Sequence, residues 1–246
     1  MKIAIISDIH GNLEALEAVA EDIKKLGITT VFCLGDIVGY GPYPSECLTF
    51  VRQLAKVILS GNHEQAVIDT IEAAREALND LAFRAIEFTR GKLSDQEVSF
   101  LLTLQPVQTI EELQITIAHG SAIPDKEWTY VEKEGVIKQE LENCPTNICV
   151  LGHTHVPLVY GSNHGLYEYL PDRMNLDKNE KYIINVGSVG QPRDDDCRAS
   201  YGIIEIDGDS TFFTLRRVFY NIQKMEDMIR EKDLDPILYE RLYRGE

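Results

Sequence analysis

The sequence predicts an α/β fold with parallel strands at its core, and two observations predict it. The first 60 residues follow the order strand, helix, strand, helix, strand, and the apolar runs at residues 2–7, 31–34 and 56–60 mark the strands. These runs are largely uninterrupted by polar residues, as expected of strands that are buried on both faces. Such a βαβαβ order is typical of parallel strands that are joined by helices.

The first helix shows how the elements between the strands are recognised. Asn12 can cap its start, and the apolar residues that follow recur at helical spacing up to Leu26. Gly27 then stands where a helix end favours glycine. The pattern therefore predicts a helix from residue 13 to residue 26, with one apolar face on the sheet.

The segment at residues 64–104 is helical in pattern, and Ser94 with Glu97 forms a capping box inside it. No Gly/Ser/Pro-rich linker flanks the segment, so we predict one domain over residues 1–246 in which residues 65–104 form a helical cap or insertion. After it we predict a hairpin, a helix, three strands and a charged helical tail, at residues 107–118, 132–141, 148–151, 182–186, 201–206 and from 221 onward.

Composition limits the class of protein. With 24 basic and 40 acidic residues the formal charge is -16, which opposes general attraction to nucleic acid or to an anionic membrane. The five cysteines include no CxxC pair and suit reduced thiols. Because no secretory signal and no apolar stretch of about 18 residues is seen, we expect a cytoplasmic protein that does not enter membranes.

The histidines gather at predicted strand ends. The chain has six, and five of them follow apolar runs: His10, His63, His119, His153 and His155. Only His164 lies elsewhere, and we interpret it as a surface residue. Because the carboxyl ends of parallel strands share one edge of a sheet, where ligands bind, these imidazoles are expected to converge.

Carboxylates and an amide accompany them. Asp8 precedes His10 by two residues, Asp36 follows the second strand within Gly-Asp, and Asn62 follows the third. Mixed nitrogen and oxygen ligands in this number exceed the needs of one tetrahedral ion and differ from the all-oxygen sites of calcium. They suit two transition-metal ions about 3.5 to 4 Å apart, with Asp36 as the candidate bridge.

The ordered motifs SDIHGN, GDIVGYG, GNHE, HG and GHTH resemble the calcineurin-like metallophosphoesterases, specifically their small bacterial and archaeal phosphodiesterase branch. The similarity spans roughly residues 1–195 and includes NVGSVGQPRD at residues 185–194. It implies a four-layer αββα fold, a β-sandwich of two mixed sheets flanked by helices, so that one parallel sheet would be only half of the structure.

The resemblance also implies roles for the residues. One metal would be held by Asp8, His10, Asp36 and His155, and the other by Asp36, Asn62, His119 and His153. His63 would stabilise the transition state or protonate the leaving oxygen. The broader family places an aspartate that orients this histidine where the present chain has Gly39, so a backbone carbonyl or water is expected to take over that task.

Two further pairs of residues have two interpretations each. Arg193, whose guanidinium suits phosphate, and Tyr40 are candidates for substrate binding, but they are equally compatible with local ion pairing and packing. Trp128 and Tyr130 either stack on a base or serve as a hydrophobic anchor, and we favour the anchor.

The predicted function is hydrolysis of a phosphodiester, in which a hydroxide that bridges two divalent ions attacks phosphorus in line. Mn, Fe, Ni, Co and Zn all suit the ligands, and we favour Mn. The expected substrate is a small phosphorylated molecule such as a nucleotide. A phosphomonoesterase, including a protein serine/threonine phosphatase, is the alternative, and a non-catalytic scaffold ranks below both. Exposed helices at residues 65–104 and in the tail are candidates for a homodimer face.

Overall fold

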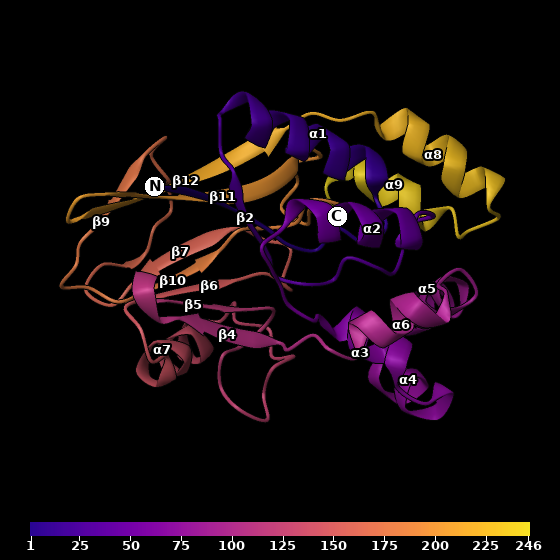
Figure 1. The fold of residues 1–246 in the computed structure, drawn as a ribbon, viewed down its shortest axis with the longest axis horizontal. Coiled ribbons are helices and arrows are strands. Elements are labelled where there is room, and N and C mark those ends of the chain that lie inside the picture. Colours follow the sequence, from indigo (N-terminus) through magenta and orange to yellow (C-terminus); the bar gives the residue numbers. More distant parts are fainter.

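Two mixed sheets of six strands each pack face to face in the computed structural model, which describes residues 1–246 (Figure 1). Sheet A has the order β3-β2-β1-β11-β12-β9, formed in that order by Val57–Ile58, Thr30–Cys33, Lys2–Ile6, Ala199–Asp207, Ser210–Val218 and Met174–Leu176. Sheet B has the order β4-β5-β6-β10-β7-β8, formed by Val107–Ile110, Ile115–Ala118, Ile148–Leu151, Tyr182–Asn185, Leu158–Gly161 and Gly165–Leu166. The expected β-sandwich is confirmed.

The parallel core predicted from the first 60 residues forms the edge of sheet A. Strand β1 pairs in parallel with β2, and β2 pairs in parallel with β3. On its other side β1 pairs antiparallel with β11, which continues into β12, so the sheet is mixed. The sequence alone suggested one parallel sheet, because strand order in the second half of the chain is not encoded in any local pattern.

Burial on both faces explains the unbroken apolar run in β1. Ile3 and Ile5 point into the core between the two sheets, whereas Ala4 and Ile6 point into the core beneath the helices. All four are at most 1% exposed. Removing a branched aliphatic side chain from water stabilises the fold by about 1.5–3 kcal/mol, so a polar residue on either face of β1 would be costly.

Helices cover both outer faces of the sandwich (Figure 1). Helices α1, Leu13–Lys25, and α2, Pro44–Leu54, pack on sheet A, and α7, Glu134–Asn143, packs on sheet B. The predicted cap of α1 is present, since Asn12 Oδ1 accepts a hydrogen bond from the backbone N–H of Ala15 at 3.1 Å. The result is the four-layer arrangement that the resemblance implied.

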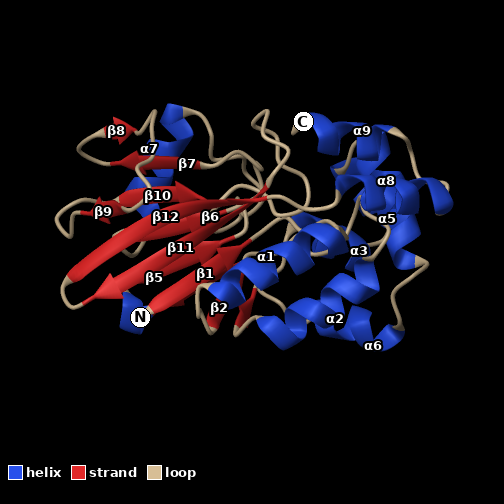
Figure 2. Cartoon of the chain, turned by 90° about the horizontal axis from the view of Figure 1, so that it is seen from above, coloured by secondary structure: helices blue, strands red, loops and turns tan.

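The remaining helices gather at one end of the sandwich (Figures 1 and 2). Four come from the predicted helical segment: α3 Asn62–Ile68, α4 Ile71–Ala77, α5 Asp80–Arg90 and α6 Asp95–Leu101. The predicted capping box at Ser94 and Glu97 starts α6. Two come from the tail, α8 Ile222–Glu231 and α9 Ile237–Arg244, and an ion pair of 2.9 Å between Arg84 and Asp235 joins the two sets.

Several boundaries differ from the predicted ones. The hairpin β4–β5 encloses a short 3₁₀ turn, Glu111–Leu113, and α7 begins two residues later than predicted. Strands β8, β9 and β12 were not predicted, because the first two have three residues or fewer and β12 carries Arg216 and Arg217 in a half-buried run. All helices are too short or too polar to span a bilayer.

Candidate metal centre

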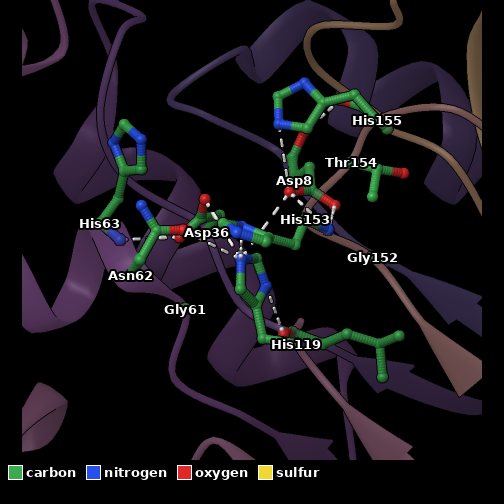
Figure 3. A network of polar contacts seen from close by, with 12 residues as sticks. Asp8, Asp36, Gly61, Asn62, His63, His119, Gly152, His153, Thr154 and His155 are labelled. Atoms are coloured by element: carbon green, nitrogen blue, oxygen red, sulfur yellow. Dashed lines mark hydrogen bonds and ion pairs between the residues drawn. The ribbon is translucent and has the colours of Figure 1, made fainter. Parts of the chain in front are cut away.

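The seven side chains predicted as ligands meet where strands of both sheets end, and Figure 3 labels all of them except His10. They follow β1, β2, β3, β5 and β6, and they are Asp8, His10, Asp36, Asn62, His119, His153 and His155. All but Asn62 are buried, with at most 5% exposure. Face-to-face packing of the two sheets therefore brings together residues up to 147 positions apart, counted from Asp8 to His155.

The ligand atoms form two groups. In one, atoms of Asp8, His10, Asp36 and His155 all lie within 4.8 Å of one another. His155 Nε2 is 3.2 Å from Asp8 Oδ1, and His10 Nε2 is 3.6 Å from Asp36 Oδ2. The ring nitrogens of His10 and His155 approach to 3.0 Å.

The second group contains Asp36, His119 and His153. His119 Nε2 is 3.4 Å from Asp36 Oδ2, 3.2 Å from His153 Nδ1 and 3.3 Å from Asn62 Oδ1. Asp36 thus belongs to both groups, and one of its oxygens, Oδ2, is the atom near both His10 and His119.

Backbone carbonyls fix the ring tautomers. Each of the four histidines turns its other ring nitrogen to a carbonyl oxygen, 2.6 to 3.1 Å away: His10 to Val38, His119 to Leu34, His153 to Trp128 and His155 to Gln191. A carbonyl only accepts, so that nitrogen carries a proton, and in the neutral ring the nitrogen in the centre presents a lone pair. With all four rings neutral, four lone pairs and two carboxylates converge, which is the donor set of a metal site.

The charges of the centre agree with a metal site. Burial alone would raise the pKa of the Asp36 carboxyl, but the neighbouring His119 and His63 hold it well below its ordinary value. Burial likewise opposes the charge of Asp8, whose pKa is nevertheless lowered by His155. Burial would lower the pKa of His119, yet Asp36 raises it to about 9. The carboxylates stay ionised and attract positive charge, as a buried cation site requires.

The backbone at these ligands is left-handed. The φ angles are 54° at Asp8, 50° at His10, 49° at Asp36, 66° at His153 and 62° at His155. The two histidines of GHTH were expected to face one side because residues two apart do so in an extended strand. They do reach the same centre, but the reason was wrong: each sits in a left-handed turn and not in a strand.

Glu64 organises two of the ligand-bearing loops, a role that sequence reasoning missed. Its buried carboxylate accepts hydrogen bonds of 2.7 to 3.0 Å from the backbone N–H groups of Asp36, Ile37, Val38 and Gly61. The loop after β2 and the loop after β3 are therefore joined through one side chain. The only signal in the sequence was its place in GNHE, directly after Asn62 and His63.

His63 lies beside the centre without a carboxylate partner. Its backbone N–H donates to Asp36 Oδ1 at 2.8 Å, while its ring packs against those of His10 and Tyr40, each with a centroid distance of 4.7 Å. The buried Nδ1 has no hydrogen-bond partner. A Cβ atom on Gly39 would stand 2.0 Å from that nitrogen, so the ring fills the space of the missing aspartate. Of the two expected partners, a carbonyl or a water, no carbonyl accepts from this nitrogen, and the ring is held by packing.

A pocket of about 220 Å³ opens over the centre. Metal-site residues, His63 and the candidate substrate-binding residues Tyr40 and Arg193 line it together with cap residues and the two aromatic residues Trp128 and Tyr130. The Tyr130 ring lies on that of His153 at 4.2 Å and the residue remains 46% exposed. Exposed His164 instead stacks on Tyr167, away from the pocket.

Asn185, at the end of β10, is a second residue that sequence reasoning left without a role. Its amide Nδ2 donates to the carbonyl oxygen of Gly152 and to Thr154 Oγ1, and so holds the GHTH turn. Ser188 Oγ donates to the carbonyl oxygen of Asp8 at 2.7 Å. The motif at residues 185–194 therefore holds two of the loops that carry predicted ligands, the GHTH turn and the loop after β1.

A metal-binding Asp/His cluster at the strand ends of an αββα sandwich defines a metallophosphoesterase type of protein, and comparison with known proteins gives the family. The chain belongs to the calcineurin-like phosphoesterase superfamily, whose domain model matches residues 1–209. One relative is an uncharacterized protein, MJ0912, of Methanocaldococcus jannaschii, which is 37% identical over 99% of this chain and 98% of its own length. Another is Phosphodiesterase YfcE of Escherichia coli, which is 26% identical over 84% of this chain and 89% of its own length. The crystal structure of a metallophosphoesterase from Sphaerobacter thermophilus is 37% identical, covers both chains fully and superposes with a TM-score of 0.85.

Proposed function

We propose that the chain is a dinuclear-metal-dependent phosphoester hydrolase that prefers phosphodiesters. The observation that carries this is the place of Asp36 in both groups of ligand atoms. Asp8, His10, Asp36 and His155 would hold one divalent ion, and Asp36, Asn62, His119 and His153 would hold the other. Two divalent ions close together can stabilise both the attacking and the leaving oxygen of an in-line displacement.

Bound cations would supply two kinds of chemistry, a lowered pKa for a water ligand and compensation of phosphate charge. The chain supplies the rest. His63, at the pocket wall next to Asn62, hydrogen bonds to the phosphoryl group in the transition state or protonates the leaving oxygen. Arg193 binds a phosphate oxygen, and Tyr40 packs His63 in place while lining the same pocket.

The charge of the pocket favours a diester over a monoester. Arg193 is the one lysine or arginine among the residues that line it, and Asp69 is there as well. A diester carries one negative charge, whereas a monoester near neutral pH carries close to two. The similarity to a relative named as a phosphodiesterase points the same way. A small phosphorylated compound such as a nucleotide is the proposed substrate.

The alternatives follow from the same site. A phosphomonoesterase or a protein serine/threonine phosphatase would use the same two metals. A non-catalytic scaffold would not need a metal-binding side chain at every ligand position, whereas this chain has one at each. Mn remains the favoured metal among Mn, Fe, Ni, Co and Zn. Residues 65–104 are proposed as a cap within one catalytic domain. A homodimer and a cytoplasmic location stay predictions.

The test is to strip the protein of metal and to add back Mn, Ni, Zn, Fe or Co singly. Hydrolysis of bis(para-nitrophenyl) phosphate should return and should exceed that of para-nitrophenyl phosphate in kcat/KM. Faster hydrolysis of the monoester would support the alternative. Absence of turnover on both esters with every metal would refute the enzymatic proposal.

Two substitutions address the site. Asp36→Asn should lose bound metal and activity together, because it weakens both groups. His63→Ala should keep the metal and lose about 100-fold or more in kcat, the usual contribution of a proton donor. His164→Ala, at an exposed histidine outside the pocket, is the matched control and should behave as the wild type. Unchanged turnover of His63→Ala would refute the role given to His63.

A further inference from the structure

The floor of the pocket is one face of α3. Asn62, Gln65, Ala66 and Asp69 all line it, and their spacing of three, four and seven residues places them on the same side of a helix. From Asn62 at the metal centre to Asp69 at the helix end is about 10 Å at the rise of an α-helix. The pocket therefore has a metal end and, two helical turns away, a cap end.

The cap end presents hydrogen-bond acceptors. Gln65 Nε2 donates to Asp69 Oδ1 at 2.7 Å, which leaves the second carboxylate oxygen and the amide oxygen of Gln65 without a partner in the protein. Arg90 lies next to this end without lining the pocket, and its Nη2 donates to the backbone carbonyls of Ala66 and Asp69 at 2.6 and 2.7 Å. A ligand group with N–H donors is matched to this end, and a second phosphate is not.

Apolar and aromatic side chains line other parts of the same pocket. Leu78 and Ala82 line the pocket from the cap, and Trp128 and Tyr130 line it from the loop before α7. The Tyr130 ring has one face on His153 and is 46% exposed, so part of its π surface is open to a ligand. Stacking on an aromatic ring contributes to the binding of any planar base.

We propose that the cap end is a specificity subsite for the organic group of the substrate, and that it takes a planar ring with an exocyclic amino group, as in an aminopurine base. The inference rests on the proposed phosphodiesterase function and adds its substrate class. Asp69 accepts the amino N–H, Gln65 fixes the carboxylate, and Tyr130 with Trp128 stacks on the ring. The same carboxylate disfavours substrates that extend the chain of phosphates into this end.

The experiment compares two diester substrates that differ by one group, the para-nitrophenyl phosphate diester of adenosine and that of purine riboside, which lacks the amino group. With the Mn-loaded protein, kcat/KM should be about tenfold higher for the adenosine diester, as expected for a hydrogen bond to a charged group. Asp69→Ala should bring this ratio close to one, Asp69→Asn should leave part of it, and Gln65→Leu should reduce it.

Glu72→Ala is the control, since it removes the same charge from an exposed position of α4 outside the pocket, and it should keep the full ratio. Thermal melting verifies that each variant is folded. A third substrate, in which a second phosphate precedes adenosine, should be poor for the wild type and should improve several-fold with Asp69→Ala.

The two proposals fail in different ways. If the metal-loaded wild type does not hydrolyse bis(para-nitrophenyl) phosphate, the function itself is refuted. If it does, but the adenosine to purine riboside ratio is near one in the wild type or is the same in folded Asp69→Ala and Gln65→Leu, the subsite assignment alone is overturned.

Discussion

At the scale of single residues, the position of the His63 ring requires a glycine at residue 39. The His63 ring occupies the position that a side chain at residue 39 would need, and no carboxylate compensates the loss of a partner at its Nδ1. The ring is instead held by contacts with His10 and Tyr40. Burial lowers the pKa of His63, and the neighbouring Asp36 opposes that shift only in part.

Gly39→Ala should therefore displace His63. We expect kcat on bis(para-nitrophenyl) phosphate to fall by about 100-fold, the cost of moving a catalytic group by about 1 Å, with bound metal retained. Gly165→Ala is a matched control: the φ angles are +87° and +85°, but nothing lies within 4 Å of a Cβ at Gly165. It should lose about 1 kcal/mol of stability and keep its turnover. Equal losses of turnover in the two variants would contradict a steric clash between a side chain at residue 39 and the His63 ring.

Residue chemistry is the most predictable part of this molecule. Histidine is rare in the chain, so the position of five of the six at strand ends is enough to indicate a site from sequence alone. Glu64 and Asn185 were missed because they hold backbone groups of distant loops, and neither distance in the fold nor backbone direction can be inferred from local sequence. Gly39 was noticed, but the packing that replaces the aspartate depends on tertiary contacts that no local pattern encodes.

At the scale of elements, Asp22 ties α1 to two strands of sheet A. Its carboxylate accepts hydrogen bonds from the Tyr201 hydroxyl of β11 at 2.6 Å and from Arg216 of β12 at 2.9 to 3.1 Å. Burial opposes the charge, but the bonds from Arg216 and Tyr201 hold the pKa of Asp22 below its ordinary value of 3.8. A lowered folded-state pKa stabilises the fold above the unfolded pKa, and this stabilisation is lost as the pH falls towards the folded value.

Asp22→Asn should lower the free energy of unfolding by about 1 kcal/mol at neutral pH, a modest value because the pair is partly open to solvent. The difference from the wild type should shrink below about pH 4, as the carboxyl protonates. Urea denaturation at several pH values measures it. Glu21→Gln, one residue earlier in the same helix and in an exposed pair with Lys25, should have no measurable effect. A loss for Asp22→Asn that is independent of pH would contradict the electrostatic account.

Elements with strong periodicity or unbroken apolar runs were predicted, and short or half-polar ones were not. Residues 148–151 form β6 as expected, whereas β12 was missed because only one of its nine residues is buried. The helical segment after β3 was predicted as a whole, though not its division into four helices. The β-sandwich came from the family resemblance and not from the pattern, since pairing between distant strands leaves no local trace.

At the scale of the whole molecule, the candidate metal centre joins the two sheets. Asp8 and Asp36 extend from sheet A and the histidines after β5 and β6 extend from sheet B. Without a cation, two ionised carboxylates are buried between them, and only partial compensation comes from His119. A cation that binds the folded state alone should stabilise the entire sandwich.

Stripping the metal should therefore lower the Tm, by about 5 to 10 °C if the ion is present at about 100 times its Kd, and adding it back should restore the Tm in a concentration-dependent way. Differential scanning calorimetry measures the shift. The Tm of Asp36→Asn should not change when metal is added, whereas the Tm of His164→Ala should rise as that of the wild type does. A wild-type Tm that does not depend on metal would contradict the linkage between the centre and the fold.

The positive φ angles at the candidate metal centre restrict which residue types these positions accept. Of the ten non-glycine residues with positive φ, six are Asp8, His10, Asp36, Tyr40, His153 and His155. Aspartate, asparagine and histidine tolerate this conformation better than other side chains, and β-branched residues are excluded from it. Backbone shape and metal chemistry thus select the same residue types. A ligand set of aspartate and histidine is not only what the ions bind well but also what these tight turns accept with least strain.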